Sequence, residues 1–244
     1  MSVRRRALAE LGVGVGLLAL AAGLTVDVLS PPKKADAEKP RTVVTNAMLQ
    51  AARTDNRCTR GRVALTFDDG PDIYTPQILK VLRAYRVRAT FFVMGQKAAA
   101  RPGLIRAEAA DGHLVENHSW SHPHLADLDQ AQIDWQLAAT QRAITTAGAP
   151  APTLLRPPFG NTSATVDGEA KLLGLRVIRW SIDTDDWRGR EPGDIAASVL
   201  DQVVPGSVVL MHDGVRQSAA TVQALPTVIR GLRARGFCTA LATD

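Results

Sequence analysis

From Gly61 onward, short apolar runs alternate with segments whose apolar residues recur at helical spacing. Such alternation predicts βα units arranged around a parallel sheet. The expected strands cover residues 63–67, 89–93, 114–116, 154–156, 177–182, 207–211 and 237–241. Helical spacing is clear over residues 76–85, 104–110, 130–147 and 220–235. Seven strands with intervening helices favour a distorted (β/α)7-type barrel over an open doubly wound sheet, although the spacing alone is compatible with both.

The first 30 residues differ from the rest of the chain. Three arginines at positions 4–6 precede an apolar run over residues 11–26. This is the pattern of a signal peptide, but the run is also only just shorter than the roughly 17 to 25 residues that span a bilayer, so an uncleaved membrane anchor is a second interpretation. Both predict an exported protein, located outside the cell or in the cell envelope. Residues 31–57 are expected to form a linker, and residues 58–244 the globular domain.

The composition and the charge narrow the class of protein. Hydrophobic residues make up 45% of the chain and charged residues 22%, which is typical of a folded domain rather than a disordered one. The formal net charge is +5, but residues 1–37 hold five basic and three acidic residues, so the remainder carries only about +3. A charge this small and scattered does not indicate nucleic-acid binding. We expect a monomer with no nucleic-acid partner.

Two cysteines, Cys58 and Cys238, lie at the two ends of the predicted domain. In an exported protein such a pair predicts a disulfide that ties the first segment of the domain to the last. Two free thiols are the alternative, because spatial proximity of the two residues is not readable from sequence.

Polar residues gather where the predicted strands end. The first strand is followed by Asp68 and Asp69, and four later strands lead into the stretches NHSWSH, RPPFG, DTDDW and HDG. In parallel α/β folds the loops beyond the carboxyl ends of the strands carry the chemistry. Five polar clusters at five strand ends therefore predict one functional site built from distant parts of the chain.

His118 and His122 are four residues apart, so one helical turn or a tight loop can direct both imidazoles to one side. With a carboxylate from Asp68 or Asp69, they would make a three-ligand site with open coordination positions, as a hydrolytic zinc site requires. Each motif alone has a simpler interpretation: two solvated surface histidines, and an ordinary acidic turn after a strand.

Adjacent carboxylates resist double ionisation unless a cation neutralises one of them. If Asp69 binds a metal ion, Asp68 is left as a general base that the Arg156 guanidinium can hold ionised. His212 follows a buried strand and is the candidate general acid, with Asp186 holding its imidazole in the right tautomer and raising its pKa.

Trp187 and Leu210 are candidates for a small apolar wall that receives a methyl group. Ordinary core packing is the alternative, because it is the commoner role of aromatic residues in such loops. His212 likewise has a simpler interpretation, as a histidine that merely ends a strand.

Taken in chain order, these motifs resemble those of the polysaccharide deacetylases, the NodB-homology domain of carbohydrate esterase family 4. The resemblance covers about residues 58–244 and rests on five motifs: TFDDGP at 66–71, HSWSH at 118–122, RPPF at 156–159, DTDDW at 183–187 and LMH at 210–212. Five motifs in the family's order are far more specific than any one of them. The resemblance implies a distorted (β/α) barrel.

The resemblance also implies roles for the site residues. Asp69, His118 and His122 would hold Zn²⁺ or another divalent metal ion such as Co²⁺. Asp68 would be the catalytic base and His212 the acid. The remaining implied roles are positioning of the base, tuning of the acid and a backbone N–H donor to the oxyanion, for Arg156, Asp186 and Phe159 respectively.

One departure from the family's pattern is visible at Phe159, where the family often has tyrosine. The implied role belongs to the backbone amide, so the missing phenol should affect substrate contacts more than the chemistry.

The implied activity is removal of N-acetyl groups from an acetylated polysaccharide that contains N-acetylglucosamine, such as peptidoglycan or a chitin-like polymer. An O-acetyl esterase of the acetylxylan type is a close alternative, because amide and ester hydrolysis pass through the same tetrahedral intermediate. A non-catalytic wall-binding protein is a third interpretation, but a pure binder has no need of a complete set of base, metal ligands, arginine and acid.

Overall fold

The structure, a computed structural model, describes residues 58–242. The predicted export segment, residues 1–30, and the predicted linker, residues 31–57, lie outside the described residues. Over residues 58–242, no helix combines the length and the apolar character that crossing a membrane requires.

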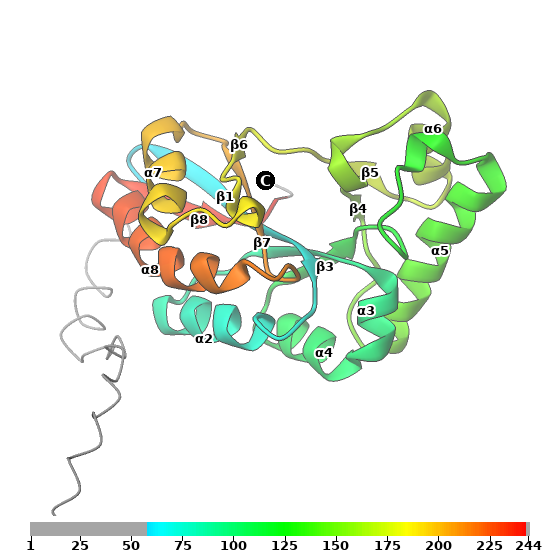
Figure 1. Ribbon diagram of the computed structural model, residues 1–244, viewed down its shortest axis with the longest axis horizontal. Coiled ribbons are helices and arrows are strands. Elements are labelled where there is room, and N and C mark those ends of the chain that lie inside the picture. The colour runs from blue at the N-terminus through cyan, green and yellow to red at the C-terminus, as the bar shows by residue number, and fades with distance from the viewer. Residues whose placement is uncertain (1–57, 243–244) are drawn as a thin grey trace, which may run out of the picture. The chain divides into compact units, whose positions relative to one another are not determined.

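A parallel sheet forms the centre of the described residues (Figure 1). Its strands are β1 (Gly61–Gly70), β2 (Thr90–Val93), β3 (Leu114–Asn117), β4 (Leu154–Leu155), β5 (Arg176–Val177), β6 (Ile182–Asp183), β7 (Val208–His212) and β8 (Phe237–Ala240). The order is β5-β4-β3-β2-β1-β7-β6, and β8 pairs with the first residues of β1. The end strands β5 and β6 pair with other strands and not with each other, so the sheet is the incomplete, distorted barrel that the sequence predicts.

The predicted strand over residues 177–182 is not one strand, and this prediction is wrong. Arg176–Val177 (β5) pairs with β4, whereas Ile182–Asp183 (β6) pairs with β7 at the other end of the sheet. The residues between them carry the chain across the open side of the half-barrel (Figure 1). A segment that leaves one partner strand to reach another cannot keep a continuous hydrogen-bonded ladder, whatever its hydrophobicity.

Helices cover the sheet and connect its strands. They are α2 (Thr75–Tyr85), α3 (Gly95–Ala100), α4 (Pro102–Ala110), α5 (Gln130–Thr146), α6 (Ala164–Leu172), α7 (Pro192–Gln202) and α8 (Ser218–Ala234), with short 3₁₀ helices at Leu125–Asp127, Pro158–Gly160 and Asp186–Arg188. The four predicted helices are confirmed, with ends that differ by at most two residues. At the start of α5, Asp129 and Gln132 form a reciprocal capping box that satisfies two otherwise unpaired N–H groups.

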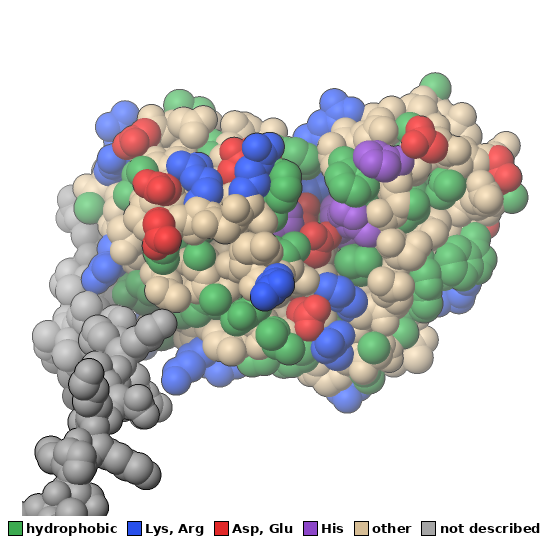
Figure 2. Space-filling model, in the orientation of Figure 1, with side chains coloured by type: hydrophobic (Ala, Val, Ile, Leu, Met, Phe, Trp, Pro, Cys, Tyr) green, Lys and Arg blue, Asp and Glu red, His purple; other side chains and the backbone are tan. Residues whose placement is uncertain are grey.

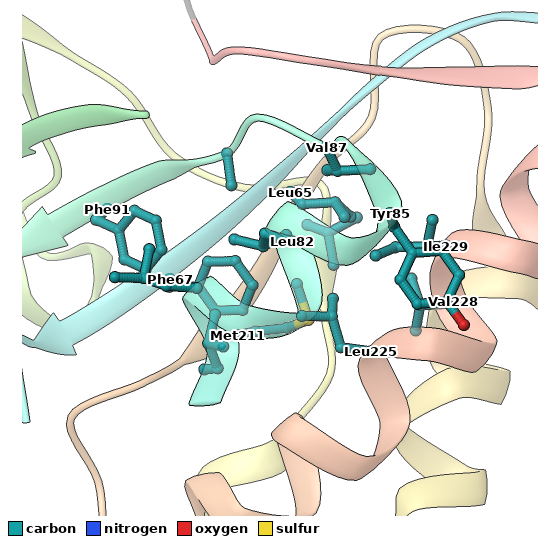
Figure 3. Packing of buried hydrophobic residues seen from close by; sticks show 14 of the residues in the cluster. Leu65, Phe67, Leu82, Tyr85, Val87, Phe91, Met211, Leu225, Val228 and Ile229 are labelled. Carbon is teal, nitrogen blue, oxygen red and sulfur yellow. The ribbon is translucent and has the colours of Figure 1, made fainter. Parts of the chain in front are cut away.

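The central strand β1 has two faces of different chemistry. Val63, Leu65 and Phe67 are buried in the main hydrophobic core. Figure 3 shows Leu65 and Phe67 in this core together with Leu82 of α2 and Leu225 of α8. Thr66 and Asp68 are equally buried but polar. Because side chains alternate along a strand, β1 presents an apolar face to the helices and a polar face to the interior of the half-barrel. The packing that stabilises the core thus also places Asp68 inside the barrel.

A disulfide joins Cys58 and Cys238, whose Cα atoms lie 5.1 Å apart. The disulfide interpretation of the two cysteines is therefore confirmed. Cys238 belongs to β8 and lies opposite Arg62 in β1, so the bond ties the first described residues to the last strand.

Replacing Cys58 and Cys238 with serine is expected to lower the free energy of unfolding by roughly 2 to 5 kcal/mol, because the bond closes a loop with a sequence separation of 180 residues and restricts the unfolded chain. Denaturant unfolding, with and without reductant, measures the loss. Reductant should shift the midpoint of the natural protein and leave that of the double-serine variant in place. A natural protein whose midpoint ignores the reductant would contradict the prediction.

Candidate metal centre and active site

Residues from five strand ends meet in one cavity at the carboxyl edge of the sheet. The cavity has a volume of about 360 Å³ and is lined by Asp68, Asp69, His118, His122, Phe159, Trp180, Asp183, Trp187, Leu210, His212 and Val215. Figure 2 shows histidine and acidic side chains gathered in this hollow. The lining includes every predicted site residue except Arg156 and Asp186, which lie buried behind Asp68 and His212.

Asp69, His118 and His122 bring their ligand atoms within 4.8 Å of one another. Asp69 Oδ1 lies 3.1 Å from His122 Nε2 and 3.4 Å from His118 Nε2. This oxygen is buried and accepts no hydrogen bond from the described residues. Burial alone would raise the pKa of Asp69, but the two neighbouring imidazoles hold it well below its usual range, so the carboxylate is ionised.

The orientation of His118 is set by a hydrogen bond on the far side of its ring. His118 Nδ1 lies 2.6 Å from the carbonyl oxygen of Arg156. A carbonyl only accepts, so Nδ1 carries a proton and donates it, and Nε2 faces Asp69. Burial lowers the pKa of His118, but Asp68 and Asp69 raise it above its usual value, which favours a proton on Nε2; a metal ion would take the place of that proton. His118 is 2% exposed, which excludes the interpretation of this residue as a solvated surface histidine.

This donor set fits a divalent metal ion. One ionised carboxylate and two imidazoles make three ligands, and a three-ligand set leaves coordination positions for water and substrate. The buried, unpartnered Asp69 Oδ1 needs such a cation to compensate its lost hydration. Imidazole and carboxylate ligands suit Zn²⁺ and similar first-row ions such as Co²⁺.

Asp68 is held by a buried guanidinium. Arg156 is 0% exposed, and its Nη1 donates hydrogen bonds to Asp68 Oδ1 and to Thr66 Oγ1, each at 2.7 Å. Burial lowers the pKa of Arg156 while Asp68 opposes the shift, and arginine remains charged in proteins. The second oxygen, Asp68 Oδ2, lies 3.8 Å from His118 Nε2, on the side of the metal ligands. One oxygen is thus fixed by Arg156, and the other faces His118.

His212 ends β7 and lies opposite Asp68 in the register of the two strands. Its Nδ1 lies 2.7 Å from Asp186 Oδ1, and its backbone N–H donates to Asp186 Oδ2 at 2.8 Å. Thr221 Oγ1 donates to the same Oδ2 at 2.5 Å. Burial would lower the pKa of His212, but Asp186 and the other nearby carboxylates raise it to about 9. The imidazole is therefore protonated at neutral pH.

Phe159, Trp187 and Leu210 line the cavity. Phe159 has a φ of 59°, in the left-handed region, and the residue is 58% exposed. The ring stacks on His124 with centroids 4.0 Å apart and meets His122 edge-on at 4.5 Å. Trp187 is 44% exposed, so it is no core residue.

Several residues of the site are absent from the site residues that the sequence analysis names. Thr66 could have been found, because alternation along β1 places it on the same face as Asp68. Thr221 lies in the first turns of α8, and Trp180 in the segment between β5 and β6, and neither position carries a local signal. Only their tertiary contacts, with Asp186 and with the cavity, reveal them.

Comparison with known proteins finds matches to polysaccharide deacetylases. A family model described as polysaccharide deacetylase matches residues 55–178, about half of the chain. The chain is 39% identical over 180 residues to the peptidoglycan-N-acetylglucosamine deacetylase PgdA of Listeria monocytogenes, covering 73% of this chain and 37% of PgdA. It is 38% identical over 179 residues to the bifunctional xylanase/xylan deacetylase of Cellvibrio japonicus, covering 73% of this chain and 26% of that protein. The chain thus spans less than half the length of either relative.

Among solved structures, the family 4 carbohydrate esterase from Streptomyces lividans, in complex with acetate, is 40% identical to this chain. The two superimpose with a TM-score of 0.70 over 74% of this chain and 92% of that one.

Proposed function

The chain belongs to the polysaccharide deacetylase family, carbohydrate esterase family 4, and from this premise we propose that it is an exported, metal-dependent N-deacetylase of a polysaccharide that contains N-acetylglucosamine. One observation carries the proposal. The base candidate Asp68, held by Arg156, and the acid candidate His212, held by Asp186, share a single cavity with the three metal-ligand candidates.

The domain organisation belongs to the proposal. Residues 58–244 are the catalytic domain, residues 31–57 the linker, and residues 1–30 a signal peptide or membrane anchor. The disulfide supports export, because disulfides are typical of oxidising compartments outside the cytoplasm. The protein would therefore act outside the cell or in its envelope, and we propose that it does so as a monomer.

Asp69, His118 and His122 are proposed to hold Zn²⁺, or Co²⁺ in its place. When bound, such an ion supplies Lewis acidity to the acetyl carbonyl and to water. Asp69 would contribute the negative charge of the ligand set, and the two histidines would contribute nitrogen ligands, of which the His118 imidazole is oriented by the Arg156 carbonyl.

The remaining residues provide the proton transfers. Asp68 Oδ2 takes a proton from the attacking water while Arg156 holds Oδ1 in place. The water oxygen bonds to the acetyl carbon, and the backbone N–H of Phe159 donates a hydrogen bond to the oxyanion that develops. The C–N bond then breaks as the His212 imidazolium protonates the departing nitrogen, which leaves a free amine and acetic acid, and the acid ionises to acetate in water. Asp68 returns its proton to solvent and His212 takes one up, which restores the starting state. Trp187 and Leu210 form the wall that receives the acetyl methyl group.

The polymer is inferred from the relatives. PgdA is by name a deacetylase of N-acetylglucosamine in peptidoglycan, which favours peptidoglycan or a chitin-like polymer for this chain. The relative named a xylan deacetylase favours the second candidate, O-deacetylation of acetylated xylan, because the catalytic residues serve ester and amide alike. The non-catalytic wall-binding function is the last candidate, and the complete set of base, ligands, arginine and acid argues against it.

Acetate release tests these candidates. The protein with added Zn²⁺ is incubated with chitin oligosaccharides, peptidoglycan and acetylated xylan side by side, with the Asp68→Asn variant as the blank. Release from the N-acetylated substrates is the expected result. Release from xylan alone would make the protein an esterase, and no release from any substrate by zinc-loaded protein would favour wall binding.

The pKa of His212 leads to a prediction for the pH dependence of the turnover. A general acid works only when protonated, so kcat should fall as the pH rises through about 9. Removing the charge of Asp186 removes the main group that raises this pKa, so the fall in Asp186→Asn should begin at lower pH. Profiles of kcat against pH for the natural protein and for Asp186→Asn test this prediction. A fall in kcat at the same alkaline pH in both proteins would contradict it.

A further inference from the structure

The loop between His118 and His122 has an unfavourable backbone conformation that other contacts must stabilise. Ser119 and His122 both have a φ of 63°, in the left-handed region that residues other than glycine rarely adopt. Such conformations persist only where the surrounding structure determines them. Residues 119–122 belong to no helix or strand, so their N–H groups find no partners in regular secondary structure.

Side chains accept all four of these N–H groups. Asn117 Oδ1 accepts from Ser119 at 2.9 Å, and Ser119 Oγ accepts from His122 at 3.1 Å. Gln136 Oε1 accepts hydrogen bonds from the two N–H groups between them, that of Trp120 at 2.8 Å and that of Ser121 at 3.0 Å. The backbone carbonyls of Ser119 and Trp120 accept hydrogen bonds from the first two N–H groups of α3, at 3.0 and 3.1 Å. The loop is thus held between α3 and α5.

Gln136 differs from the other two acceptors because it is distant in the sequence and lies on a separate element, α5. Its amide makes a third bond with the loop, since Nε2 donates to Ser121 Oγ at 3.0 Å. The residue is 8% exposed, so water has little access to replace these bonds. One buried side-chain amide therefore supplies hydrogen-bond partners to Trp120 and Ser121, in the middle of the loop between His118 and His122.

We propose that Gln136 is a positioning residue for the metal site. It fixes the course of the backbone between His118 and His122, whose ring centroids lie 5.0 Å apart, so that both Nε2 atoms face Asp69 Oδ1 before any ion binds. Groups that orient metal ligands typically change metal affinity by roughly 10- to 100-fold when they are lost. The inference rests on the metal site of the proposed function and assigns that site a support on α5.

Zinc affinity tests the inference directly. Gln136→Met keeps the length of the side chain and removes all three hydrogen bonds, so the dissociation constant for Zn²⁺, measured by competition with a chromogenic chelator, should rise by about 10- to 100-fold. Gln136→Glu keeps an acceptor for the two N–H groups and should retain most of the affinity. Gln141→Met is the matched control, because Gln141 lies on the same helix and donates to the carbonyl of Leu173, away from the loop.

The melting temperature of each metal-free variant separates positioning from a general structural role. Comparable melting temperatures for Gln136→Met and Gln141→Met, with weakened zinc binding only in Gln136→Met, support positioning. Should Gln136→Met not fold, Gln136→Asn, whose amide is one methylene too short to reach the loop, takes its place. Natural zinc affinity in a folded Gln136→Met or Gln136→Asn variant overturns the inference, whereas a natural protein that binds no zinc overturns the proposed metal site itself.

Discussion

Replacement of Asp69, His118 or His122 with alanine is expected to strip the protein of zinc and of most of its deacetylase activity. Each variant leaves two ligands. Removing a group that only orients a ligand lowers metal affinity by up to roughly 100-fold, so the loss of zinc affinity on removing a ligand itself should be greater. In the two histidine variants the buried Asp69 Oδ1 also loses one of its neighbouring imidazoles. Zinc content after gel filtration, together with acetate release, measures the effect.

A matched histidine variant serves as the control for this result. His124 stacks on Phe159 close to the cluster but does not belong to the ligand set, so His124→Ala should keep its zinc. Normal zinc content in all three ligand variants would refute the ligand assignment.

The Asp68→Asn variant is expected to keep its metal and to lose about 10² to 10⁴ in turnover rate, the usual contribution of a general base. The amide has nearly the shape of the carboxylate and still offers Oδ1 to Arg156, but it takes no proton from water at neutral pH. Steady-state kinetics and zinc content are measured on the same preparation.

Loss of the Asp68 charge leaves the buried Arg156 guanidinium without its counter-ion, which is destabilising. Assays of Asp68→Asn are therefore made well below its melting temperature. Asp72→Asn is the comparison, because Asp72 follows in the same loop and pairs with Lys97 and Arg101 without lining the cavity. Turnover close to normal in Asp68→Asn would remove the proposed mechanism.

The parts of the protein that sequence alone could determine are those with a local physical cause. Period-two alternation in β1 assigns Leu65 to the core and Asp68 to the opposite face, because successive side chains in a strand point to opposite sides. Helical spacing located α2, α4, α5 and α8 to within two residues at each end. Since the carboxyl ends of parallel strands lie along one edge, the polar residues after five strands are assigned to one site by their positions in the chain alone.

Other features depend on partners that are distant in the chain. The stretch over residues 177–182 is rich in apolar residues, yet it is divided between β5 and β6, because different strands at opposite ends of the sheet supply its hydrogen bonds. Strands of two residues have no periodicity to detect, so only their neighbours define them.

The candidate site divides in the same way. The sequence by itself determined which residues could act as ligands, base and acid, because those roles follow from side-chain chemistry and from position after a strand. Only the tertiary structure decided which groups orient these residues by hydrogen bonds. The Arg156 carbonyl orients His118, Thr221 donates to the Asp186 carboxylate, and Gln136 accepts from the backbone of the loop between His118 and His122. These hydrogen bonds join residues at least 15 positions apart in the sequence, and such contacts leave no periodic pattern in it.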